Sequence, residues 1–155
     1  MTTQRTPQYR PTPEQSSALD AYVKLSRAAA AVQSAIHRHL HDADLTIAQF
    51  GVLEALLHLG PMSQGTLARK ILTSPGNLTN VVDKLQGRGL IRRERDATDR
   101  RVVLVHLTDR GRTSIEELMP SHVRQVTDAF APLDPNERHH LAALCRTLGR
   151  AQEKP

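Results

Sequence analysis

Residues 74–107 read SPGNLTNVVDKLQGRGLIRRERDATDRRVVLVHL, and the periodicity of this stretch changes half-way. The apolar residues of its first half are spaced three and four apart: Leu78, Val81, Val82 and Leu85. That spacing predicts one buried face of a helix. After Gly89, apolar and polar residues alternate, which predicts strands over 90–95 and 101–107. The polar residues 96–100 between them are typical of a turn, so we expect a helix followed by a hairpin with a charged tip.

Local signals place another helix directly before this one. Ser74 is expected to be the N-cap and Pro75 the first helical residue, where its missing N–H costs nothing. A short helix is expected to open at Ser63 and to run to about Leu72. Two helices that meet at a short turn form the helix-turn-helix unit. The expected fold is therefore mainly α, a winged helix-turn-helix with a small β-hairpin wing.

Longer helices flank this unit. Thr46 and Gln49 have the spacing of a capping box, and Gly60-Pro61 ends the helix that they begin. Before it, an apolar stripe predicts one helix over 14–42. Such a helix is about 43 Å long at 1.5 Å per residue, which is longer than a small core is wide. We therefore expect part of its stripe to pack on a second subunit.

Downstream, Thr108 caps a helix that is expected to kink at Pro120. A last helix carries an apolar stripe over 141–148, and Cys145 on this stripe is expected to be a buried small hydrophobe.

The predicted division of the chain is a flexible tail over 1–13, an N-terminal dimerisation helix over 14–42, a winged helix-turn-helix lobe over 43–111 and C-terminal dimerisation helices over 112–152.

Residues 69–101 hold the whole charge surplus of the chain. The 155 residues carry 21 Lys+Arg and 16 Asp+Glu, a net charge of +5. Nine of these bases and four of these acids lie within 69–101, so the rest of the chain is neutral. A solvated basic face and an anionic partner are both compatible with this surplus. The four aromatic residues are too few for the base-stacking platform of a single-strand or RNA binder.

The predicted second helix leaves short polar residues exposed. Asn77 and Asn80 can pair with adenine edges in the major groove, and Thr79 can bond a base or pack on a thymine methyl. Gly76 removes bulk where base contact is closest, and Ser74 with the free N–H groups of the first turn suits a phosphate. The alternative is a polar face that meets only water. Asn is a mediocre helix former, however, and Glu, Lys or Ala would serve such a face better.

The hairpin tip adds an independent signal for DNA. Arg95, Arg100 and Arg101 flank it, and a guanidinium is attracted to the negative potential of a minor groove. Asp99 stands two residues before Arg101, so a bidentate pair is expected to hold that guanidinium in place. An ordinary surface ion pair is the alternative. The expected contact set is completed by Lys84 on the second helix and by Ser63 and Gln64 at the DNA backbone.

Four segments resemble the multiple-antibiotic-resistance regulator (MarR) family: LTIAQFGVL over 45–53, GTLA over 65–68, NLTNVVDKL over 77–85 and the wing over 89–111. The resemblance covers roughly residues 20–150, and the wing with its trailing Leu-Thr-x-x-Gly is the most specific part. It implies a homodimer that binds short inverted repeats in double-stranded DNA, usually as a repressor. It also implies a small phenolic or other lipophilic effector, bound in a cleft between the dimerisation helices and the DNA-binding lobe.

The resemblance also implies residue roles. An Arg matching Arg101 enters the minor groove in that family, and an acid matching Asp99 orients it. The residues that lie at the major groove match Ser74, Asn77, Thr79 and Asn80.

Other classes of protein are weighed against this interpretation. His37 and His41 have a spacing that can hold a metal, but a solvated helix end accounts for it, so neither a metal nor a cofactor is expected. A metal-responsive regulator of the same fold and a winged helix that docks an acidic protein are the alternatives. No nucleophile elbow, phosphate loop or zinc-protease motif is present, so we expect no enzyme. A signal peptide and a membrane-length apolar run are also missing, which predicts a cytoplasmic protein.

Overall fold

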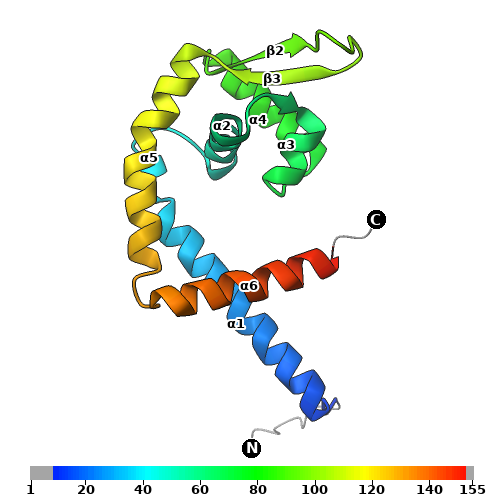
Figure 1. The fold of residues 1–155 in the computed structure, drawn as a ribbon, viewed down its shortest axis with the longest axis vertical. Helices are drawn as coiled ribbons and strands as arrows, with labels where there is room; N and C mark the ends of the chain where they lie inside the picture. Colours follow the sequence, from blue (N-terminus) through cyan, green and yellow to red (C-terminus); the bar gives the residue numbers. More distant parts are fainter. Residues whose placement is uncertain (1–8, 153–155) are drawn as a thin grey trace, which may run out of the picture. The chain divides into compact units, whose positions relative to one another are not determined.

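A computed structural model describes residues 9–152, and the first eight residues of the predicted tail lie outside this range. The chain divides into two units, residues up to Ala35 and residues from Ile36 onward. The elements are α1 (Pro13–Ile36), a 3-10 turn (Arg38–Leu40), α2 (Ile47–Leu59), β1 (Met62–Ser63), α3 (Gln64–Lys70), α4 (Pro75–Gly87), β2 (Ile91–Arg95), β3 (Val103–Leu107), α5 (Asp109–Ala129) and α6 (Pro135–Gln152). The expected class, a mainly α winged helix, is confirmed (Figure 1).

Helix α1 is shorter than predicted, because it ends at Ile36 rather than near residue 42. The chain then makes a 3-10 turn that brings Leu40 into the core, where it is 2% exposed. Asp44 adopts a left-handed φ of 51°. The next residue, Leu45, is also buried. The apolar stripe thus continues past Ile36 in sequence, but its last leucine serves the core of the second unit instead of extending the helix.

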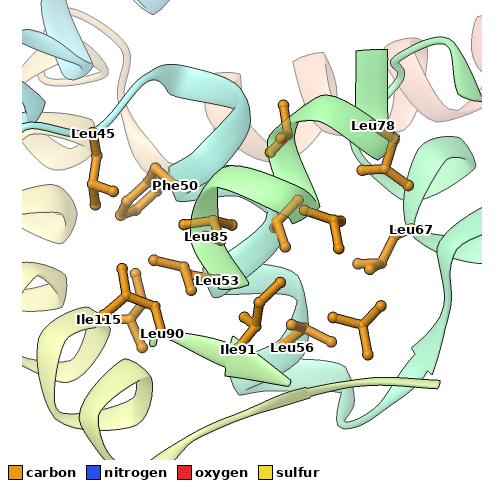
Figure 2. Packing of buried hydrophobic residues seen from close by; sticks show 14 of the residues in the cluster. Leu45, Phe50, Leu53, Leu56, Leu67, Leu78, Leu85, Leu90, Ile91 and Ile115 are labelled. Atoms are coloured by element: carbon orange, nitrogen blue, oxygen red, sulfur yellow. The ribbon is translucent and has the colours of Figure 1, made fainter. Parts of the chain in front are cut away.

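The hydrophobic core of the second unit is built from α2, α3, α4, the sheet and the start of α5 (Figure 2). Phe50 and Leu53 of α2 meet Leu85 of α4, Leu90 and Ile115, and all five side chains are almost fully buried. Burying a side chain of this size stabilises the fold by about 1.5–3 kcal/mol. The predicted buried face of α4 is confirmed, since Leu78, Val81 and Val82 lie in the same cluster with Leu85.

Side-chain caps fix where the helices begin. Thr46 and Gln49 form the predicted capping box, with N–H to oxygen distances of 2.9 and 3.2 Å. The hydroxyls of Ser63, Ser74 and Thr108 cap α3, α4 and α5 as expected. Each such cap is worth about 0.5–2 kcal/mol. Helix α3 ends at Lys70, earlier than the predicted Leu72, and α5 remains a single helix through Pro120.

The wing is part of a three-stranded antiparallel sheet with the order β1-β3-β2, rather than the predicted two-stranded hairpin. The additional strand is Met62–Ser63, which pairs with Val105 and Leu104 of β3. Two residues are too few to show an alternating pattern, so the sequence carries no periodic signal for this strand. The strand anchors the base of the wing directly at the start of α3.

The junction between α5 and the wing is exceptionally close. The Thr108 hydroxyl donates to the Gly89 carbonyl at 2.7 Å, and the Thr108 N–H donates to the Leu90 carbonyl at 3.2 Å. Gly111, one turn into α5, lies against the same backbone, because a Cβ built on it would stand 1.8 Å from the Leu90 oxygen. Only glycine fits at this position without moving the strand.

Helix α6 begins at another capping box, in which Asp134 accepts from the Glu137 N–H at 2.9 Å and Glu137 accepts from the Asp134 N–H at 2.8 Å. Its apolar stripe is exposed in the single chain, and Leu144 keeps 56% of its surface. Cys145 is exposed as well, so the expectation of a buried cysteine is wrong for this chain alone. None of the described helices is sufficiently long and apolar to traverse a bilayer.

A cluster of aromatic rings interrupts the apolar core. The buried ring of His122 on α5 lies 4.6 Å from Phe50, 5.5 Å from His39 and 6.2 Å from His37, measured between ring centroids. Both ring nitrogens of His39 and the Nδ1 of His122 are buried and have no hydrogen-bond partner among residues 9–152. Nε2 of His122 stands 3.7 Å from Oε1 of Glu54. The cluster therefore packs by shape and leaves part of its polar capacity unused.

The spacing considered for a metal does not persist in the structure. Because α1 ends at Ile36, His37 and His41 are no longer one turn apart on a helix. His37 joins the ring cluster, and His41 is exposed. Within residues 9–152, no group of three or more His, Cys, Asp or Glu side chains is arranged to hold a metal ion.

Replacing Gly111 by Ala should destabilise the fold by about 3 kcal/mol or more, at or above the usual cost of overpacking, because the new methyl meets backbone that cannot rotate away. Chemical denaturation measures the loss. Gly65→Ala is the matched control, since a Cβ at this helical position meets no atom within 4 Å. Equal stability of the two variants would contradict the tight junction.

Acidification should destabilise the protein through His122. Burial lowers the pKa of His122 from 6.5, Glu54 opposes this shift, and His39 and His37 add to it. Between the lowered folded pKa and the unfolded value of about 6.5, the unfolded chain binds more protons, so the free energy of unfolding falls as the pH drops through this window. Urea denaturation from pH 7.5 to 5 should show a weaker pH dependence for His122→Phe. The exposed His139→Gln is the control, and an unchanged dependence in His122→Phe would exclude His122 as its source.

Candidate nucleic-acid interface

Helix α4 presents its polar residues on the side opposite the core. All six predicted contact residues of this element are exposed: Ser74, Gly76, Asn77, Thr79, Asn80 and Lys84. The four apolar positions take up the buried side, so burial alone determines which face is presented. These side chains form a continuous polar surface, and the structure does not test which of them touch DNA.

Internal hydrogen bonds orient several of these side chains. Asn77 Nδ2 donates to the Thr73 hydroxyl at 2.7 Å, and the Thr79 hydroxyl donates to the Pro75 carbonyl at 3.1 Å. The Ser74 hydroxyl accepts from the Asn77 N–H at 3.3 Å. Within residues 9–152, no hydrogen bond holds the side-chain amide of Asn80, so this amide is not committed to a neighbouring group. Asn77 keeps its carbonyl oxygen available as an acceptor.

The two residues expected at the DNA backbone are half-buried and already engaged. The Ser63 hydroxyl accepts from the Thr66 N–H at 3.2 Å and donates to the Thr66 hydroxyl at 3.1 Å. Gln64 Nε2 donates to the Thr79 hydroxyl at 3.4 Å. Gln64 thus connects the start of α3 to the exposed face of α4, a role that the sequence did not indicate.

The tip of the wing is ordered by carboxylates that bind backbone. Asp96 accepts from the N–H groups of Thr98 and Asp99 at 2.7 and 3.0 Å, and from the Thr98 hydroxyl. The Thr98 hydroxyl and these two N–H groups hold the pKa of Asp96 below its usual value. Such an Asx turn is a common way to close a loop. The tip therefore has a defined conformation although it is exposed.

The expected bidentate pair between Asp99 and Arg101 is wrong. Asp99 Oδ1 accepts from the backbone N–H of Arg101 at 3.0 Å, and no ion pair joins the two side chains in the described chain. The short loop puts the carboxylate nearest to the backbone, and this bond orients the chain instead of the guanidinium. The side chains of Arg95, Arg100 and Arg101 are all exposed around the tip.

Arg93 is the residue of this region that the sequence interpretation missed. Its guanidinium reaches Gln64 on α3 and Asp83 and Gln86 on α4, at 3.1, 2.5 and 2.6 Å. The neighbouring Arg92 pairs with Glu94 at 2.6 Å within the strand. Alternation along β2 places Arg93 on the same side as the buried Ile91, so a charged residue at a core-side position was the available signal.

A hollow of about 550 Å³ lies next to the start of α4. Its walls come from α2, the end of α3 and the turn before α4. The lining is largely apolar, and its polar residues are His37, Glu54, His58, Lys70 and Thr73. Leu72 in the turn has a left-handed φ of 54° and is 93% exposed. A volume of roughly 300–1,000 Å³ is typical of small-molecule sites.

Comparison with known proteins agrees with this geometry. A model of the MarR family matches residues 45–103, which run from the start of α2 to the wing. The HTH-type transcriptional regulator YkoM of Bacillus subtilis is 33% identical, and the match covers 85% of this chain and 86% of YkoM.

Two solved structures extend the comparison. BpsR of Bordetella bronchiseptica, described for regulation of its DNA binding by 6-hydroxynicotinic acid, is 31% identical with a TM-score of 0.75, covering 84% of this chain and 98% of BpsR. Sco3205 of Streptomyces coelicolor is a MarR family regulator solved in complex with DNA. It is 25% identical with a TM-score of 0.79, and the match covers 94% of this chain and 95% of Sco3205. The fold is thus shared with known regulators over most of the chain, and this protein belongs to the MarR family of DNA-binding transcriptional regulators.

Proposed function

We propose that this chain acts in the cytoplasm as a homodimeric repressor that binds an inverted repeat in duplex DNA and releases it when a small aromatic acid binds. The observation that carries the DNA-binding part is the joining of the polar face of α4 to the wing through Arg93. The face offers amides for base edges, and the tip offers guanidinium groups to a neighbouring minor groove.

The case for a dimer rests on apolar surface that the single chain leaves uncovered. Helix α1 has no buried residue, and Tyr22 on it is 67% exposed. On α6, Leu141, Leu144 and Leu148 are exposed together. Contiguous apolar surface of this kind marks an interaction site, and a symmetric dimer is the commonest solution. Two copies of α4 then read half-sites roughly 34–36 Å apart.

Specific roles follow for the exposed residues. Asn77 and Asn80 read base edges in the major groove, with Thr79 beside them, and Ser74 at the helix start contacts a phosphate. Arg101 enters the minor groove, and Asp99 fixes its backbone at 3.0 Å. The carboxylates of the tip bind backbone N–H groups, and within residues 9–152 no ion pair occupies the guanidinium groups there, so these groups are available to bind phosphate oxygens or a groove.

The hollow beside α2 is proposed to take the effector. Its apolar walls suit a planar ring, and Lys70 with the lining histidines suits a carboxylate. The similarity to BpsR supports the same class of ligand. Ile71, Leu72 and Thr73 form one wall and lead directly into α4. A ligand that binds the DNA-free arrangement more tightly than the DNA-bound one shifts the equilibrium towards release.

Selection of bound duplexes from a random pool tests the DNA-binding function. We expect the protein to recover an inverted repeat with half-sites about one helical turn apart. Arg101→Ala should weaken binding to this repeat about tenfold or more, as expected for the loss of one specific contact. Lys24→Ala is a charge-matched control on α1, where Lys24 pairs with Asp20 at 2.6 Å. Recovery of no common sequence, or equal binding by Arg101→Ala, would contradict this proposal.

Titration with 6-hydroxynicotinic acid tests the effector class. We expect the acid to raise the Kd for the selected duplex, and its uncharged amide to act more weakly. Lys70→Ala should reduce this preference for the acid, because it removes a cation from the lining of the hollow. Calorimetric binding of the acid with no change in DNA affinity would separate binding from regulation and would refute release by this ligand.

A further inference from the structure

The guanidinium of Arg93 holds three side chains from two helices. Its Nε donates to Gln64 Oε1 at 3.1 Å, its Nη1 to Gln86 Oε1 at 2.6 Å and its Nη2 to Asp83 Oδ1 at 2.5 Å. Gln64 belongs to α3, Asp83 and Gln86 belong to α4, and Arg93 itself is the middle residue of β2. All three nitrogens of one planar group are therefore engaged, each with a different side chain.

This arrangement fixes orientation more than it adds stability. An exposed ion pair contributes only about 0–1 kcal/mol, and the Asp83 carboxylate is 59% exposed. A guanidinium is planar and directs its donors along fixed directions, so three acceptors around it define both the distance and the angle between the elements that carry them. The Arg93 side chain is itself only 24% exposed, which limits its freedom to choose other partners.

The contacts of Arg93 reach the residues proposed to read DNA. Asp83 stands three positions after Asn80 and so lies on the adjoining turn of α4. Gln64, which accepts from Arg93, donates to the Thr79 hydroxyl at 3.4 Å. Arg93 is also two residues before Arg95, where the charged tip begins. One side chain thus connects the base of the wing to the reading face of α4.

We propose that Arg93 is a positioning residue that sets the spacing between the recognition helix and the wing, so that both enter their grooves in register. The proposal rests on the function proposed above, in which the helix and the wing bind together. Arg93 does not need to touch DNA for this role. Its charge is already matched by Asp83, so it adds little to the general attraction for phosphates.

The test compares specific with non-specific binding. Arg93→Gln and Arg93→Lys are measured against the selected duplex and against a random duplex of equal length, over a range of salt concentrations. We expect both variants to raise the Kd for the selected duplex about tenfold, the scale of one lost base contact. Binding to the random duplex should change less than about threefold, and the salt slope should stay within about one unit of wild type.

Arg92→Gln is the matched control, because Arg92 is the adjacent residue of the same strand and its main partner is Glu94. It removes the same charge without touching α3 or α4, and its specificity ratio should stay near that of wild type. Asp83→Asn supplies a second readout. If Asp83 and Arg93 act as one unit, the double variant should lose no more specificity than Arg93→Gln alone.

The outcomes separate this proposal from simpler ones. An equal loss of affinity for both duplexes in the Arg93 variants would show a phosphate contact and would overturn the positioning role. Lower thermal stability with an unchanged specificity ratio would show a merely structural role and would also overturn it. Where Arg93→Gln fails to fold, the ratio for Arg93→Lys decides. If wild-type protein recovers no common duplex, the proposed DNA-binding function itself is wrong. The selection is therefore done before the variants are compared, so that this failure is distinguished from failure of the positioning role.

Discussion

The burial of one face of α4 is the constraint on which the exposed polar surface of this helix depends. Leu78, Val82 and Leu85 are fully enclosed between α2, α3 and the sheet, and no rotation of the helix keeps them there while turning another side outward. Each contributes about 1.5–3 kcal/mol, which outweighs the weak helix propensity of the two asparagines. Packing of the core therefore determines which side of α4 faces solvent, and the residues on that polar side are not part of the core.

Local chemistry made much of this fold predictable. The caps at Thr46, Ser74 and Thr108 are hydrogen bonds between residues three apart in the chain. Both partners of each bond therefore lie in one short stretch of sequence, where the pattern can be recognised. The change of period at Gly89 is local in the same sense. These signals located α2, α4 and both long strands to within a few residues, and they indicated which side of α4 is buried.

The features that were missed depend on residues far apart in the chain. Strand β1 exists because Met62 and Ser63 find β3 some forty residues later. Helix α1 ends at Ile36 because the chain must turn there to bury Leu40 in the core. Arg93 meets Gln64 across twenty-nine positions. The wrong pairing of Asp99 with Arg101 has another origin, because spacing alone does not show whether a carboxylate binds a side chain or the nearer backbone N–H.

The charged residues of the wing form two groups with different roles. At its base, Arg92 and Arg93 are matched by Glu94 and Asp83 and serve to hold structure. At its tip, Asp96 and Asp99 bind backbone N–H groups, and within residues 9–152 no carboxylate forms an ion pair with the arginines there. These two carboxylates remain charged, but they order the backbone of the tip rather than pairing with its guanidinium groups. Residues 91–107 carry five arginines against three acids, and three of these arginines lie at the tip, where the minor-groove contact is proposed.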